Sequence, residues 1–196
     1  MRTTEFLKRL AMASAIALTG GCAAVVVGGA AAGASAAHDR RGFGSVVSDR
    51  NIQITASEAI GGDRELVAAS NIKVVVYNGV LLLAGQVPTE AMKARAEHHV
   101  TGYRGVTRVV NELVVALPEG FWDRRRDNTL TARVKAGLLD LTSLPGFDPM
   151  RVNVTTSGRI VYLMGLVSHR EADAVADIAR HTNGVDKVVK VFDYTD

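Results

Sequence analysis

Two stretches of the chain share one residue pattern, 80 positions apart. Residues 72–85 read IKVVVYNGVLLLAG, and residues 152–165 read VNVTTSGRIVYLMG. Each has a strand-like run, a short polar turn that contains glycine, and a second apolar run that ends in glycine. An internal repeat of this kind defines the unit of folding. The repeat therefore predicts two copies of one small domain.

The 196 residues divide around the repeat into two domains of roughly 70 residues each. We expect the first domain at residues 48–117 and the second at residues 127–196, with a linker at residues 118–126. Domains of this size bury only about 60% of the surface of the unfolded chain. Since each is marginally stable alone, we expect them to pack on each other or on something else.

The first domain is expected to begin with a short helix. Ile52, Ala56 and Ile60 share one helical face, Ser48 or Asp49 is suited to its N-cap, and Gly61-Gly62 ends it. The dipeptide Asn78-Gly79 predicts a hairpin between two strands. The expected elements after the helix are strands at 72–77 and 80–87, a helix at 90–101 and a strand at 106–115.

The second domain is expected to repeat this order. Asp127 is suited to cap a helix whose apolar face contains Leu130, Val134 and Leu138. Ser168 and Glu171 form a capping-box pattern. The expected elements are strands at 150–156 and 159–167, a helix from Ser168 to His181 and a strand at 185–194. We therefore expect an α+β fold of two αββαβ units, each a three-stranded mixed sheet covered by two helices.

The N-terminus is typical of an export signal. Arg2, Lys8 and Arg9 precede an apolar run from Leu10 to Leu18. Cys22 is the only cysteine, so it cannot form an internal disulfide. The stretch LTGGC at residues 18–22 resembles a bacterial lipobox. That resemblance implies a signal peptide at residues 1–21, an acylated Cys22 and a flexible tether at residues 22–47.

Two other interpretations of the N-terminus stay open. The tripeptide ASA at residues 34–36 suits an ordinary signal peptidase, which would release a soluble protein. Alternatively, residues 10–37 are long enough to span a bilayer as an uncleaved anchor.

The basic character of the whole chain comes from its first residues. The chain has 23 basic and 20 acidic residues, and removal of residues 1–21 leaves 20 and 19. A nearly neutral mature chain gives no reason to expect nucleic acid as a partner. Only a local patch can carry an electrostatic argument.

The sequence contains no catalytic motif that we recognise. It lacks the nucleophile-elbow, metalloprotease and phosphate-loop patterns. His98 and His99 are adjacent, so they point in different directions from a helix and cannot ligate one metal together. We expect a non-enzymatic protein with surface histidines and with no cofactor, metal or small-molecule substrate.

The strongest local signal for function is the sequence FWDRRR at residues 121–126. Its tryptophan is the only one in the chain, and three arginines follow it closely. Indole rings lie at headgroup depth in membranes, where guanidinium groups meet phosphates. The segment therefore suits a membrane interface. It equally suits a plain interdomain linker whose tryptophan caps an apolar edge and whose arginines face water.

The residues that follow each hairpin resemble the BON domain. In the first copy the resemblance extends from Gly85-Gln86-Val87 to Gly105-Val106. In the second it extends from GLVSHREA at residues 165–172 to Gly184-Val185. Two such domains behind a lipobox are similar to the dual-BON lipoproteins of Gram-negative bacteria. The resemblance implies the outer membrane, because Ala23 rather than an aspartate follows Cys22.

In lipid-binding members of that group, the first helix of the second domain contacts anionic phospholipid. They have a tryptophan where this chain has Thr129, so either Trp122 substitutes from the preceding turn or the lipid contact is weaker. The expected phospholipid-binding residues are Trp122, Arg124, Arg125, Arg126, Thr129, Leu130, Arg133 and Val134.

The expected function is that of a periplasm-facing outer-membrane lipoprotein that binds anionic phospholipid and supports envelope integrity. One alternative is an adaptor that binds a protein of envelope assembly or cell-wall machinery, with residues 121–126 as a linker only. A second alternative is a soluble periplasmic protein of osmotic stress.

Overall fold

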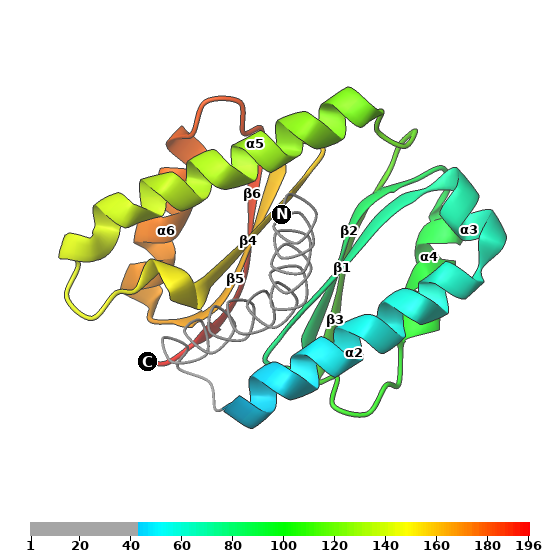
Figure 1. Ribbon diagram of the computed structural model, residues 1–196, viewed down its shortest axis with the longest axis horizontal. Coiled ribbons are helices and arrows are strands. Elements are labelled where there is room, and N and C mark those ends of the chain that lie inside the picture. Colours follow the sequence, from blue (N-terminus) through cyan, green and yellow to red (C-terminus); the bar gives the residue numbers. More distant parts are fainter. Residues whose placement is uncertain (1–42) are drawn as a thin grey trace, which may run out of the picture. The chain divides into compact units, whose positions relative to one another are not determined.

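The computed structural model describes residues 43–196, which belong to one compact unit (Figure 1). Cys22, the expected signal peptide and most of the expected tether lie outside the described residues. The first domain consists of α2 (Phe43–Gly62), α3 (Arg64–Ala69), β1 (Asn71–Tyr77), β2 (Val80–Val87), α4 (Glu90–Val100) and β3 (Arg108–Val115).

The sheet of the first domain has the order β1-β2-β3. Strands β1 and β2 pair antiparallel, and β2 pairs parallel with β3 across the crossover helix α4. Asn78 and Gly79 have φ angles of 52° and 75°. Two residues with positive φ form the tight turn whose twist suits a hairpin. The predicted Asn-Gly hairpin is therefore confirmed.

The second domain repeats this topology with the sheet order β4-β5-β6. The β4–β5 pair is antiparallel and the β5–β6 pair parallel. Ser168 and Glu171 form the predicted capping box at the start of the crossover helix. The elements are α5 (Phe121–Gly137), η1 (Leu138–Ser143), η2 (Pro149–Arg151), β4 (Val152–Ser157), β5 (Ile160–Val167), α6 (His169–His181) and β6 (Lys187–Tyr194).

Each sheet is covered on one face by the helices of its own domain (Figure 1). Alternate residues of a strand point to opposite faces, so one set of strand residues packs on helices. In the first domain Leu81 and Leu83 pack with Ala56 of α2. In the second, Val161 and Leu163 pack in the core that also contains Val134 of α5. The predicted α+β fold with two mixed three-stranded sheets is confirmed.

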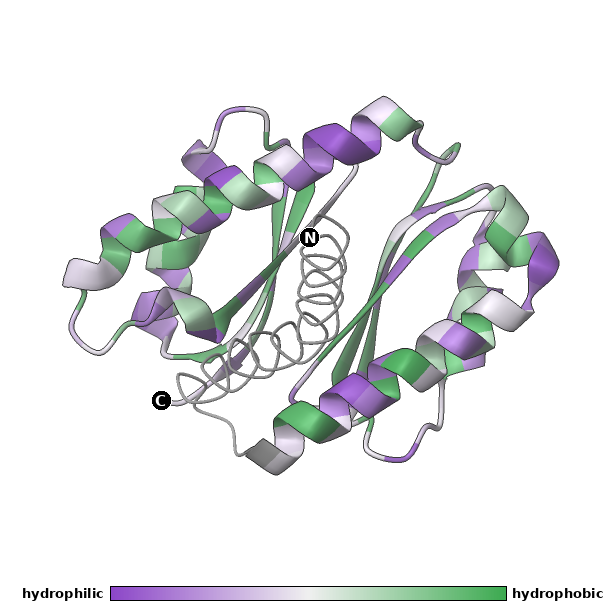
Figure 2. Cartoon of the chain, in the orientation of Figure 1, coloured by the Kyte–Doolittle hydropathy of each residue, from purple (hydrophilic) through white to green (hydrophobic). Residues whose placement is uncertain are grey.

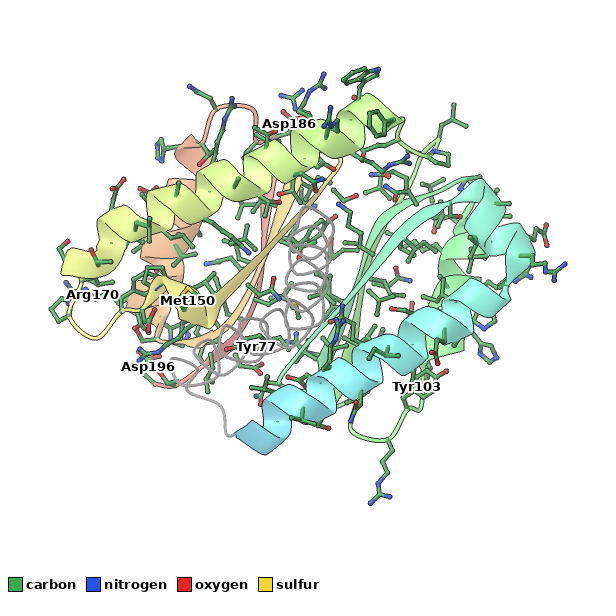
Figure 3. The ribbon with its side chains drawn as sticks, in the orientation of Figure 1. Tyr77, Tyr103, Met150, Arg170, Asp186 and Asp196 are labelled. Carbon is green, nitrogen blue, oxygen red and sulfur yellow. The ribbon has the colours of Figure 1, made fainter. Side chains whose placement is uncertain are left out.

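A third core cluster joins the strands of the two domains. Its members are Tyr77, Val80, Leu82 and Ala84 of the first sheet, with Tyr162, Met164 and Val191 of the second. The side chain of Tyr77 (Figure 3) spans the seam: its hydroxyl donates to the carbonyl of Arg151 and accepts from the N–H of Leu166, both at 3.3 Å. The two domains therefore bury the second faces of their sheets against each other.

The first helix of each domain differs from its prediction. Helix α2 begins at Phe43, five residues before Ser48, so residues 43–47 are helical and not part of a flexible tether. Helix α5 begins at Phe121, so the expected linker at residues 118–126 is mostly helix, and Asp127 lies inside α5 rather than at its N-cap. The helix α3 and the two 3-10 segments were not expected from the sequence.

The physical reason is that both aspartates have a partner elsewhere. The carboxylate of Asp49 accepts from the backbone N–H groups of Asn78 and Gly79 at 2.6 and 2.8 Å. The carboxylate of Asp127 accepts from those of Gly158 and Arg159 at 2.9 and 3.0 Å. Each first helix is thus fastened to the hairpin turn of its own domain.

Candidate functional site

The first turn of α5 presents two aromatic rings to solvent. Trp122 is 72% exposed and Phe121 is 58% exposed. The rings meet edge to face with centroids 5.4 Å apart, and the guanidinium of Arg125 lies 5.4 Å from the centroid of the Phe121 ring. Aromatic rings of this size are usually buried unless they serve an interface. Residues 121–126, the aromatic-basic segment, therefore begin a helix that exposes two apolar side chains to solvent.

The arginines of this segment are exposed and only lightly paired. Arg124 donates to the carbonyl of Glu119 at 3.1 Å, and Arg126 lies 3.4 Å from the carboxylate of Asp123. An exposed ion pair of this kind contributes little to stability. The guanidinium groups are consequently available for an anionic partner.

Charge along α5 is strongly asymmetric. Five basic residues occur in residues 121–137, which are Arg124, Arg125, Arg126, Arg133 and Lys135. The two acidic residues of the same stretch are Asp123, which pairs with Arg126, and Asp127, which is buried against the hairpin turn. The N-terminal half of α5 is accordingly the strongly hydrophilic part of this helix in Figure 2. The outward side of α5 is therefore positively charged.

Two shallow grooves run along α5. One, of about 750 Å³, is lined by Trp122, Arg125, Arg126 and Thr129. The other, of about 600 Å³, is lined by Arg126, Thr129, Arg133 and Arg159. The guanidinium of Arg159 is held by Asp186 at 2.8 Å and by the carbonyl of Gly184 at 3.0 Å.

Arg159 is a candidate that the sequence analysis missed. It belongs to the β4–β5 turn, and only the fold brings that turn beside α5 through the bonds to Asp127. Three guanidinium groups around one groove suit the oxygen atoms of a phosphate or carboxylate.

Two of the expected lipid-binding residues do not belong to this surface. Leu130 and Val134 are 1% and 0% exposed, and Val134 packs in the core of the second domain. They lie on the inward face of α5, so they cannot insert into a bilayer. The other expected residues, Trp122, Arg124, Arg125, Arg126, Thr129 and Arg133, are exposed on α5.

A carboxyl pair lies where the chain enters α5. The pKa of Glu119 is raised, first by burial and then by the neighbouring carboxylate of Asp127. One carboxyl oxygen of Glu119, Oε2, is buried without a hydrogen-bond partner. A neutral Glu119 could donate from that oxygen to the carboxylate of Asp127, because two close carboxyl groups favour one neutral member. The chain therefore enters α5 beside a carboxyl group whose pKa is raised.

The histidines of the described region are dispersed. His169 stacks on Tyr194 with ring centroids 3.9 Å apart, and His181 pairs with Asp177 within its own helix. His99 is half-buried and lies 2.9 Å from Asp63, contrary to the expectation of a surface position. Among residues 43–196, no group of three or more His, Cys, Asp or Glu is placed to hold a metal ion. Within the same residues, no helix has the length and apolarity of a membrane span.

Comparison with protein families identifies the repeat. The BON-domain model matches residues 48–116 and again residues 126–196. The chain belongs to the BON-domain family. The two matched segments cover all but the first residues of the two units, so each BON domain corresponds to one copy of the repeat.

Two named relatives match the chain over most of their length. The outer membrane lipoprotein DolP of Haemophilus influenzae is 36% identical over 195 residues, which cover 99% of this chain and 100% of that protein. A 21 kDa hemolysin of Actinobacillus pleuropneumoniae is 33% identical over 156 residues, covering 80% of this chain and 79% of that protein. The chain is thus a dual-BON protein similar to DolP.

A solved structure also aligns with the chain, at a much lower level. The C-terminal domain of CdsD, a structural protein of the type III secretion system of Chlamydia trachomatis, has a TM-score of 0.28 and 11% identity. The alignment covers 70% of this chain and 94% of that one. A likeness of this size carries no argument here.

Proposed function

We propose that this protein is a non-enzymatic outer-membrane lipoprotein that binds anionic phospholipid through α5 of its second BON domain and supports envelope integrity. The observation that carries the proposal is the exposed Phe121–Trp122 pair at the start of a helix whose outward side is basic. The similarity to the outer membrane lipoprotein DolP over nearly the whole chain supports the location.

The proposed mechanism combines a covalent lipid anchor with a weaker contact to lipid headgroups. Acyl chains on Cys22 would hold the chain at the periplasmic side of the outer membrane. Once the anchor is in place, the α5 surface acts at high effective concentration. The guanidinium groups would bind headgroup phosphates while Trp122 lies at headgroup depth.

The test is binding of the protein to vesicles of phosphatidylglycerol and phosphatidylcholine. A chain that begins at residue 22 and carries Cys22→Ser is suitable, because the core clusters lie within residues 43–196. Replacement of Arg125, Arg126 and Arg133 by alanine should weaken binding about 100-fold, since each basic residue near an anionic surface contributes about 1 kcal/mol. The matched control removes three exposed arginines of the first domain: Arg50, Arg64 and Arg104.

Three results separate the proposal from its rivals. Binding should fall at high salt and should be weak on vesicles of phosphatidylcholine alone. Equal binding to neutral and anionic vesicles, or an unchanged affinity of the α5 triple variant, contradicts lipid binding and favours a protein-interaction adaptor for envelope assembly. Mass spectrometry of the mature N-terminus tests the anchor, because an acylated Cys22 excludes both a soluble periplasmic protein and an uncleaved anchor.

A further inference from the structure

A third groove lies at the opposite end of α5 from Trp122. It has a volume of about 340 Å³, and its lining is mainly apolar: Ala136, Leu139, Pro149 and Met150, with Lys135 at one side. Leu139 is 59% exposed and Met150 is 61% exposed. We call it the distal groove. Nothing in the proposed function so far uses it.

The distal groove is held open by local hydrogen bonds. The carboxylate of Asp148 accepts from the N–H of Met150 at 2.9 Å, and Pro149 fixes the backbone between them. The guanidinium of Arg151 donates to the carbonyl of Gly146 at 2.7 Å. On the other side, Leu138 anchors η1 because its side chain is buried in the core. Met150 (Figure 3) therefore stays exposed on a fixed backbone.

The distal groove continues the outward side of α5. Trp122, Arg125, Thr129, Ala132 and Ala136 are exposed and follow each other at intervals of three or four residues. Residues at that spacing lie on one helical face. With a rise of 1.5 Å per residue, the 17 steps from Trp122 to Leu139 extend over about 25 Å. Large apolar side chains thus lie at both ends of this helical face, with Thr129, Ala132 and Ala136 as small residues between them.

The charge of this stripe indicates which partner covers it. Between Asp123 and Asp140 the acidic residue is Asp127, which is buried. Lys135 lies beside the distal groove. An anionic surface that is apolar beneath its charges matches this combination of basic flanks and apolar ends, as for amphipathic helices that lie in a membrane interface. A soluble acidic partner would not need Leu139 and Met150 exposed.

We infer that the distal groove receives an acyl chain of the anionic phospholipid bilayer, with Lys135 beside the headgroup. The inference rests on the proposed function and adds a second, apolar point of contact at the C-terminal end of α5. Two contacts about 25 Å apart fix the helix parallel to the membrane plane. One contact at Trp122 would leave the protein free to tilt.

The test compares binding and depth on the chain that begins at residue 22 with Cys22→Ser. The variant Leu139→Ser/Met150→Ser should bind anionic vesicles about tenfold more weakly. Both side chains are exposed, so the fold is expected to survive, and circular dichroism checks this. The matched control Ile54→Ser/Val67→Ser changes two exposed apolar residues of the first domain and should bind as the parent does.

Depth is measured with lipids that carry nitroxide groups on their acyl chains. A fluorophore on Met150→Cys should be quenched, and one on Val67→Cys should not. Trp122, the only tryptophan, reports the N-terminal contact in the same sample.

Quenching of Trp122 with an unquenched probe at residue 150 overturns the distal groove and leaves the proposed function intact. An unchanged vesicle affinity of the Leu139→Ser/Met150→Ser variant also overturns the distal groove as a lipid contact. It would point to a protein partner for this groove. Absence of all vesicle binding overturns both.

Discussion

Helices α2 and α5 occupy the same place in the two domains, yet their outward sides have little in common. Inward, Ile52, Ala56 and Ile60 of α2 correspond to Leu130, Val134 and Leu138 at the end of α5. In both helices an aspartate fastens the hairpin turn. The duplication has therefore kept apolar side chains, and the aspartate, at the positions that hold the fold.

Outward, the same alignment pairs unlike residues. Gly44, Val47, Ser48 and Thr55 of α2 stand where α5 has Trp122, Arg125, Arg126 and Arg133, and all eight are exposed. Exposed positions of a helix tolerate substitution with little effect on stability. The difference teaches that the exposed side of a helix can change completely while the shared scaffold beneath it stays the same.

The largest expected effect comes from removing the aspartate that fastens each first helix to its hairpin turn. Asp49→Ala and Asp127→Ala each leave two backbone N–H groups of a hairpin turn without their carboxylate. Hydrogen bonds to a charged group contribute about 1.5–3 kcal/mol, so each variant should lose about 3 kcal/mol of unfolding free energy in urea. Asp123→Ala, half-buried on α5 and paired only with Arg126, is the control and should lose less than about 0.5 kcal/mol. A large loss of unfolding free energy for only one of the two variants would show that Asp49 and Asp127 do not contribute equally to stability.

The second prediction concerns transfer of the outward residues of α5 to α2. Introducing Gly44→Trp, Val47→Arg, Ser48→Arg and Thr55→Arg gives α2 the outward residues of α5. The transfer is made in a chain whose own α5 arginines have been replaced by alanine. It should raise the affinity of that chain for anionic vesicles at least tenfold, which is about 1.4 kcal/mol of binding free energy. The control introduces alanine at the same four positions. No gain with the arginines and tryptophan would mean that the grooves beside Arg159, and not the helix face alone, are required.

The smallest expected effect concerns the start of α5. The pKa of Glu119 is raised above its ordinary value of 4.5 by burial and by Asp127. Its neutral form therefore stabilises the fold, fully so below pH about 4.5, and that stability is lost as the pH rises through the folded-state pKa. Glu119→Gln keeps the neutral form, so it should be more stable than the parent at pH 7 and equal to it at pH 4. The gain should be below about 1 kcal/mol because solvent screens a partly buried group.

Thermal unfolding at several pH values measures this difference. Glu58→Gln, on the exposed side of α2, is the matched control in the first domain. A stability gain of Glu119→Gln that persists at pH 4 would contradict a raised pKa of Glu119 as its cause.

Local signals predicted much of the fold, because their partners lie close in sequence. The Asn78-Gly79 turn and the Ser168–Glu171 capping box each involve residues at most three apart. The starts of α2 and α5 were not predictable in this way. Asp49 and Asp127 have the residue type of an N-cap, but their hydrogen bonds go to turns 29–32 residues away.

The candidate site shows the same division between local and distant information. Trp122 and its arginines could be found from composition, whereas Arg159 reaches the α5 surface only through the fold. For Leu130 and Val134 the sequence contained the correct signal: their helical spacing marks an inward face, and the family resemblance was the poorer guide. Both are buried in the structure.

The core that joins the two sheets has a consequence for how the protein can be divided. A fragment with one domain would expose Tyr77, Leu82 and Ala84, or Tyr162, Met164 and Val191, as an open apolar sheet face. Exposed apolar faces and unpaired strand edges promote aggregation. During export, the half that arrives first would expose this apolar face until the other half has arrived, and we expect a proteolytic cut between them to leave a noncovalent pair. The two BON domains are thus two copies of one fold that form a single unit of assembly.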